Sequence, residues 1–137
     1  MSMIPYALEV KRDDVQIGGR GRLRMAREFI MTPIFDRQWN DVGLSDDDLR
    51  QLQSSLLKKP SIGDIIQGTG GARKIRFALP HGGKSSGVRV IYLDIVHLQK
   101  LYLLLCYPKS KQDDLTFEHK KQVKLLTGML KGERIHG

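Results

Sequence analysis

The chain has 137 residues, enough for one domain, and its 40% hydrophobic and 28% charged residues are ordinary for a globular protein. No apolar run approaches the roughly 20 residues that span a bilayer, and the N-terminus lacks a signal-peptide layout, so we expect a cytoplasmic protein. A single cysteine, Cys106, excludes an internal disulfide and a cysteine-built zinc site; within residues 103–107 (LLLCY) it is expected in the core.

The positive charge is concentrated in the middle of the chain. The whole sequence has a net charge of +8 and a pI near 9.8. Residues 58–111 hold ten Lys or Arg against two acidic residues, whereas residues 28–57 hold two Arg against six. This distribution indicates a surface for a polyanion, although a solvated basic face would explain the charge alone about equally well.

The first 27 residues differ in composition from the rest. Residues 18–22 (GGRGR) form a basic, glycine-rich stretch with poor periodicity, which predicts a disordered N-terminal extension over residues 1–27. Met25 could then be the native start, and an RNA-contacting tail is the alternative. We expect one folded domain over residues 28–131 and a flexible tail over 132–137.

A strand and two helices are predicted next. Residues 28–32 form a strand-like run, and a short helix over residues 34–40 follows Thr32-Pro33, with Phe35 and Trp39 one turn apart. Ser45 to Asp48 resembles a capping-box start, and four leucines between residues 49 and 57 form an apolar stripe of a second helix that ends before Pro60.

Three strands and a last helix complete the expected order. The strands lie over residues 72–78, 87–96 and 101–107, and the helix over residues 116–130. The order is strand, helix, helix, strand, strand, strand, helix. It predicts an α+β fold with a small, mostly antiparallel sheet of about four strands and helices packed on one face.

Basic side chains alternate with apolar ones on the first of these three strands. Ile75 and Phe77 should face the helix-covered core, which places Lys74 and Arg76 on the open face, where a phosphate backbone would stabilise them. Arg89 begins the middle strand, but both faces of that strand are apolar, so its orientation stays open. An ordinary solvated strand face is the alternative to an RNA-binding one.

Several chemistries can be set aside. The four histidines have no metal-ligand spacing, the glycines at 68–71 lack the ending of a P-loop, and no Ser–His–acid pattern is present, so we expect no metal and no cofactor. A purely cationic site can still cleave RNA, because the 2′-hydroxyl is an internal nucleophile that needs a base and a group to hold the phosphorane charge. Tyr92, Tyr102 or Tyr107 could stack bases, although core packing explains most of them.

One segment resembles a known family. Residues 63–76 (GDIIQGTGGARKIR) are similar to the signature of HigB-type members of the RelE/ParE toxin superfamily. The similarity continues through residues 82–84 (GGK), 87–92 (GVRVIY), 101–104 (LYLL), 107–109 (YPK) and 113–115 (DDL), and covers roughly residues 28–130.

The resemblance implies a RelE-like fold and a toxin of a type II toxin–antitoxin system that cleaves mRNA on the ribosome. It also implies a neighbouring antitoxin, usually a HigA-like helix-turn-helix protein that binds the operator DNA. By motif position, the catalytic cations would be Lys74, Arg76 and Arg89. The expected RNA-binding residues are Arg73, Lys84, Lys109 and Lys111.

Two departures from the family pattern stand near the end of the last strand. Pro108 replaces a common glycine, and Ser110 replaces a frequent asparagine or arginine. They leave room for a slow or inactive relative, and the alternative function is a non-catalytic nucleic-acid-binding protein or operon co-repressor.

Overall fold

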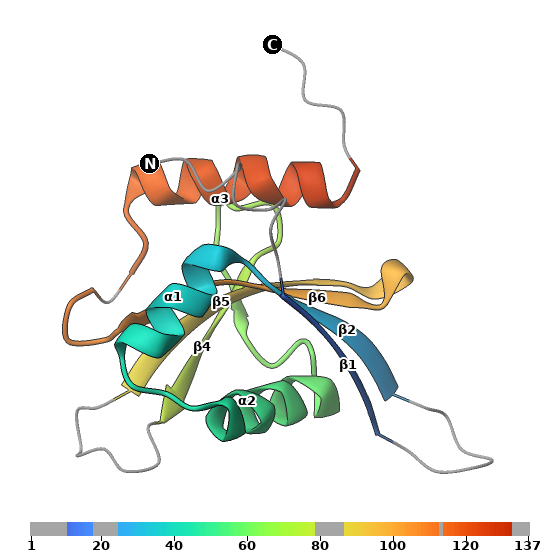
Figure 1. Cartoon of the computed structure of the whole chain (residues 1–137). Coiled ribbons are helices and arrows are strands. Elements are labelled where there is room, and N and C mark those ends of the chain that lie inside the picture. The colour runs from blue at the N-terminus through green and yellow to red at the C-terminus, as the bar shows by residue number, and fades with distance from the viewer. Residues whose placement is uncertain (1–10, 18–24, 79–86, 113, 133–137) are drawn as a thin grey trace.

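The computed structural model describes residues 11–17, 25–78, 87–112 and 114–132 (Figure 1). All six strands form one sheet in the order β1-β2-β6-β5-β4-β3, in which β2 and β6 are parallel and every other neighbouring pair is antiparallel. The elements in chain order are β1 (Lys11–Ile17), β2 (Met25–Met31), α1 (Pro33–Asp41), α2 (Asp46–Lys58), β3 (Asp64–Ile65), β4 (Arg73–Ala78), β5 (Gly87–Ile95), a 3-10 turn (Val96–Leu98), β6 (Lys100–Pro108) and α3 (Phe117–Leu130). The predicted α+β class is confirmed.

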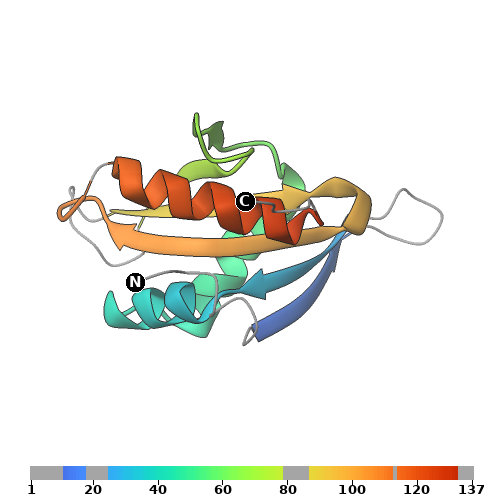
Figure 2. The same ribbon diagram turned by 90° about the horizontal axis from the view of Figure 1, so that it is seen from above.

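The helices cover both faces of the sheet, which corrects the prediction that they share one face. Helix α2 lies on one side and α3 on the other, and from above α3 runs along β5 and β6 (Figures 1 and 2). The reason is the central strand β5, whose side chains are buried on both faces. Val88, Val90 and Tyr92 enter one core, and Ile91 and Leu93 enter the other. A strand that is apolar on both sides needs a helix layer on each.

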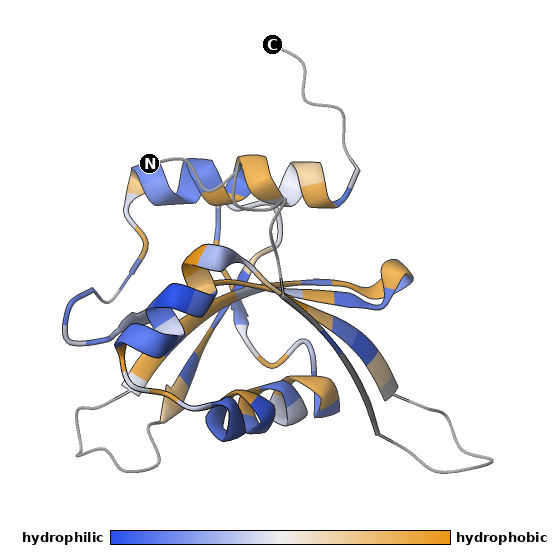
Figure 3. Cartoon of the chain, in the orientation of Figure 1, coloured by the Kyte–Doolittle hydropathy of each residue, from blue (hydrophilic) through white to orange (hydrophobic). Residues whose placement is uncertain are grey.

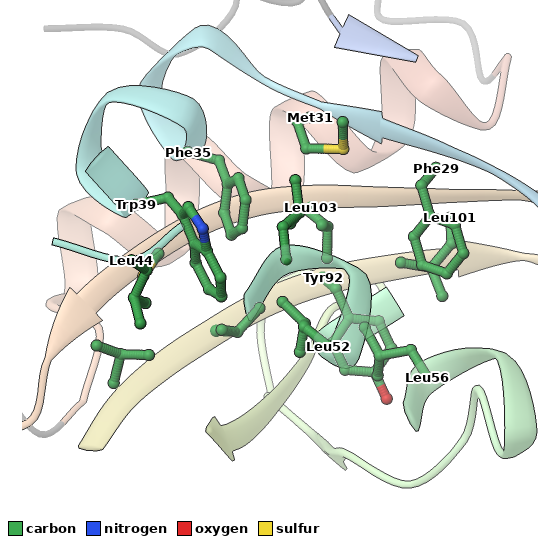
Figure 4. Close-up of a cluster of buried hydrophobic side chains, with 14 of the residues drawn as sticks. Phe29, Met31, Phe35, Trp39, Leu44, Leu52, Leu56, Tyr92, Leu101 and Leu103 are labelled. Atoms are coloured by element: carbon green, nitrogen blue, oxygen red, sulfur yellow. The ribbon is translucent and has the colours of Figure 1, made fainter. Parts of the chain in front are cut away.

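The first core lies between the sheet and helices α1 and α2, and we call it the α1/α2 core (Figure 4). Its largest contributors include Phe35 and Trp39 of α1, whose rings stack with centroids 5.5 Å apart. Phe77 of β4 packs on Trp39 at the same centroid distance. Helix α2 begins as predicted, with a capping box between Ser45 and Asp48. Helix α1 begins at Pro33, one residue before its predicted range, and the Thr32 side chain caps it.

The second core, the α3 core, lies on the opposite face. Val123 and Leu126 of α3 pack with Ile91 and Leu93 of β5. In Figure 3, β5 and β6 are largely hydrophobic, whereas α2 and α3 alternate hydrophobic and hydrophilic residues. The helices therefore bury one side each and leave the other to solvent.

The glycine-rich loop between β3 and β4 anchors α3. The Thr127 hydroxyl of α3 lies 2.7 Å from the Thr69 carbonyl oxygen, and the Lys131 ammonium group donates to the Gly70 carbonyl. A Cβ atom on Gly70 would lie 2.6 Å from Thr127 Oγ1, and Gly70 has φ +76°, so this close approach requires glycine. The residues of this loop therefore hold α3 in place.

A β-bulge interrupts β6. Ile91 pairs with Leu105 and Tyr92 pairs with Leu103, which leaves Leu104 as an extra residue. The Thr32 hydroxyl donates to the Leu104 carbonyl at 2.8 Å. Because side chains alternate along a strand, the extra residue turns everything after it to the opposite face.

The N-terminal region also differs from its prediction. Residues 11–17 form β1, which pairs antiparallel with the whole of β2, so the expected disorder over residues 1–27 is wrong for this part. The expected domain boundary at residue 28 falls inside β2. Together with the two-residue strand β3, β1 raises the strand count from about four to six. Among the described residues, no helix has the length and apolarity needed to cross a membrane.

Candidate nucleic-acid interface

Three basic side chains gather on the α3 side of β4 and β5. Ile75 and Phe77 pack on the α1/α2 core, so Lys74 and Arg76 project to the other face, as alternation predicts. Arg76 pairs directly with Arg89 in the β4–β5 ladder, which settles the open orientation of Arg89: it lies on the same face. We call Lys74, Arg76 and Arg89 the cationic row.

The cationic row lines one open hollow along β4. The hollow has a volume of about 410 Å³ and extends toward α2 and β3. Asp64 of β3 also lines it, and Asp64 is the ladder partner of Lys74. Arg76 and Arg89 are also directly opposed on neighbouring strands, where Cβ atoms lie about 4.5–5.5 Å apart. A single phosphate group can therefore reach both of these cations.

Arg76 and Arg89 carry like charges directly opposite each other on adjacent strands, so the two side chains repel each other. A bound phosphate would offset that repulsion, since guanidinium groups bind phosphate through paired hydrogen bonds. Gly87 makes room for this arrangement. A Cβ atom at Gly87 would lie 3.0 Å from Arg76 Nε, so the arginine side chain runs across the glycine.

Asp114 closes the other end of the row and was not predicted as a site residue. Its carboxylate forms an ion pair with Lys74, although Asp114 itself is exposed. The hydrogen bond from Lys74 holds the pKa of Asp114 below its ordinary value, and the charges of Lys74, Lys120 and Arg89 act in the same direction. Asp114 therefore sits in the positive field of the row.

The other expected RNA-binding residues are more dispersed. Arg73 faces the opposite side of β4, where its guanidinium group donates to the carbonyl oxygens of Ser61 (3.1 Å) and Gly63 (2.6 Å), a contact that holds the chain before β3. Lys109 and Lys111 are exposed just after β6, and the Lys109 amide donates to Gly87 O, which places it beside the start of β5. Lys84 lies outside the described residues.

Two tyrosines near the row have different surroundings. Tyr92 is fully buried in the α1/α2 core; its hydroxyl accepts from the Gly63 amide and donates to the Pro60 carbonyl. It is a core residue and not a base-stacking one. Tyr107 pairs with Arg89 in the β5–β6 ladder and lies on the α3 side, in line with Arg89 and Arg76.

Within the described residues, no group of three or more His, Cys, Asp or Glu side chains is placed to hold a metal ion. The arrangement offers phosphate-binding cations and one lysine paired with a carboxylate, beside the buried Tyr107. It suits recognition of a phosphodiester.

Comparison with known proteins gives little more. No protein-family model matches the chain. Among solved structures, the chain is similar to the toxin RelE of Escherichia coli, a double arginine-to-alanine mutant in the free state, with 18% identity and a TM-score of 0.44. The match covers 62% of this chain and 85% of that one. An identity and a TM-score this low do not establish a shared family. A family assignment depends instead on the sequence motifs and on the cationic row.

Proposed function

We propose that this chain is the toxin of a type II toxin–antitoxin system, a HigB-type member of the RelE superfamily that cleaves mRNA on the ribosome. The observation that carries the proposal is the cationic row. Lys74, Arg76 and Arg89 come from two different strands, and all three line one hollow. They are the positions at which the family resemblance expects catalytic cations.

The proposed reaction is metal-independent attack of a 2′-oxygen on the adjacent phosphorus. The 2′-oxygen bond to phosphorus forms, the bond to the 5′-oxygen breaks, and the products are a 2′,3′-cyclic phosphate and a 5′-hydroxyl. Lys74 would accept the 2′-hydroxyl proton. Arg76 and Arg89 would hold the charge that develops on the phosphorane. Lys109, beside the start of β5, would assist RNA binding or protonate the leaving 5′-oxygen.

The proposed partners follow from this role. The chain would act in the cytoplasm on ribosome-bound mRNA, with no cofactor. A cognate antitoxin, of the HigA-like helix-turn-helix type, would neutralise it and bring it to operator DNA.

Primer extension on a reporter mRNA in a cell-free translation reaction tests the proposal. We expect new 5′ ends within translated codons for the wild-type chain, none on naked RNA, and none with the triple variant Lys74→Ala/Arg76→Ala/Arg89→Ala. The matched control removes the same charge from α2 and its C-cap residue through Arg50→Ala/Lys58→Ala/Lys59→Ala, positions that do not line the hollow, and should still cut. Cuts by the cationic-row variant would show that the site is elsewhere.

A second candidate, RNA binding without cleavage, is favoured by the Lys74–Asp114 ion pair, because a paired lysine is a poor base. It predicts translation arrest or operator binding without new 5′ ends. RNA affinity would still fall with salt, with a slope of about −0.7 per phosphate contact on a single strand. Loss of cutting with preserved, salt-dependent binding would select this candidate.

A further inference from the structure

A second hollow lies beside the cationic row, on the same side of the sheet. It has a volume of about 200 Å³ and lies between α1, β6 and the first half of α3. Its floor includes Leu105 and Tyr107 of β6, both members of the α3 core. Its polar walls come from Gln38 of α1, Gln112 before α3, and His119 and Gln122 of α3.

Two contacts connect this hollow to the cationic row. Tyr107 is the ladder partner of Arg89, so the hollow begins one strand away, and neighbouring strands are about 4.8 Å apart. In addition, the Gln112 side-chain amide donates to the Asp114 carbonyl oxygen at 2.7 Å, and the Asp114 carboxylate pairs with Lys74. A nucleotide whose phosphate sits on Arg89 would therefore hold its base near Tyr107.

The lining has the chemistry that recognises a base. Leu105 and Tyr107 are each less than a tenth exposed and form an apolar floor, whereas the exposed His119 ring can stack on a base and the glutamine side chains can bind its polar edge. The Cys106 amide donates to Gln38 Oε1 at 2.8 Å, which fixes the Gln38 amide group at the wall of the hollow. A volume of about 200 Å³ is below the roughly 300–1,000 Å³ of pockets for drug-sized ligands, so a single base is the appropriate occupant.

We propose that this hollow binds one base of an RNA strand whose phosphate lies on the cationic row, and that it sets the sequence preference of the protein. The inference rests on the proposed function to the extent that the row must bind RNA. It adds His119 and Gln122 as specificity-determining residues. Neither belongs to the cationic row.

Fluorescence anisotropy with the full chain tests it. The probes are labelled 2′-O-methyl tetranucleotides of A, C, G or U, which cannot be cleaved because the attacking oxygen is blocked, and an abasic tetramer of the same charge. We expect the best base to bind about tenfold more tightly than the abasic probe, the scale of stacking one base on an aromatic side chain. The variant His119→Ala/Gln122→Ala should bind that base as weakly as the abasic probe, with abasic affinity unchanged.

The matched control is His97→Ala/Gln51→Ala, the same two changes at exposed positions outside the hollow, and it should keep the wild-type preference. Equal affinity of the wild type for abasic and base-bearing probes, or no binding to any probe, would overturn the inference. A preference that survives in the His119→Ala/Gln122→Ala variant would overturn it as well.

Failure of the proposed function gives a different pattern. If the base preference is present and lost in the variant while primer extension shows no cuts, the base site stands and the nuclease activity falls. If the cationic-row variant binds every probe as the wild type does, the RNA site assumed here is wrong, and the inference falls with it.

Discussion

Replacing Tyr92 with Phe isolates two buried hydrogen bonds at the start of the β3–β4 segment. The ring stays in the α1/α2 core, so apolar burial is unchanged, but the hydroxyl is removed from the Gly63 amide (2.8 Å) and the Pro60 carbonyl (2.7 Å). Gly63 is buried, and a buried amide left without a partner costs about 1–3 kcal/mol. Pro60 is half-buried, so water can partly replace the second hydrogen bond, and its loss costs only about 0.5–1 kcal/mol.

We therefore expect Tyr92→Phe to lower the free energy of unfolding by about 1.5–4 kcal/mol, a large fraction of the roughly 5–15 kcal/mol of a typical domain. Urea unfolding followed by the fluorescence of Trp39, the single tryptophan, measures this. Tyr102→Phe, on the half-buried Tyr102 of β6, is the matched control and should cost less.

Hydrogen exchange at the Gly63 amide provides a local measurement. We expect it to accelerate in Tyr92→Phe. A loss below about 1 kcal/mol together with unchanged Gly63 protection would refute the reasoning. Burial also raises the pKa of the Tyr92 hydroxyl above its ordinary value of about 10. Above that pH the unfolded chain loses the proton before the folded one, so the wild type should lose stability as pH rises, and this component should be absent in Tyr92→Phe.

Three further changes have definite expected outcomes. In Lys74→Ala, the Asp114 carboxyl should titrate at higher pH than in the wild type, as followed by NMR, because Lys74 is the main cause of its lowered pKa; an unchanged midpoint would contradict the ion pair. The fully buried Cys106 thiol, with its pKa raised to about 12, should resist a thiol reagent at pH 8 and react once urea unfolds the chain; fast labelling of the native chain would contradict this. Thr127→Val should lower stability by about 1–2 kcal/mol in urea unfolding, because it removes the bond to the buried Thr69 carbonyl; no loss would show that this bond does not hold α3.

Local signals were enough to predict the helices and strand β4. Thr32-Pro33 and Ser45 to Asp48 are capping patterns that act within a few residues, and the structure has a helix after each. The alternation of Ile75 and Phe77 with Lys74 likewise fixed the face of β4, because one core covers the apolar side.

Features that depend on distant contacts were missed. Strand β1 has the sequence KRDDVQI, without a regular apolar alternation, and its pairing with β2 defines it as a strand. The second helix layer was missed because β5 is apolar on both sides, and only the docking of α3 shows that both sides are buried. Asp114 joins Lys74 from 40 residues away, which no local pattern indicates.

The bulge explains why Tyr107 could not be placed from the sequence. Simple alternation puts Tyr107 on the face of Leu101 and Leu103, which lie in the α1/α2 core. The extra residue Leu104 turns Tyr107 to the α3 core and beside Arg89. Nothing in the sequence LYLLLCY marks which leucine is the extra one.

The one parallel pair in the sheet has a consequence for how the chain folds. Glu28 of β2 pairs with Lys100 of β6, which closes a long loop, whereas β5 and β6 are joined by a turn of a few residues. Local pairings form early, and those that close long loops form late, because the entropy of loop closure must be overcome first. We expect β4, β5 and β6, with the cationic row, to assemble before β2 and β1 add to the sheet. Substitutions at the β2–β6 boundary should then speed unfolding more than they slow folding.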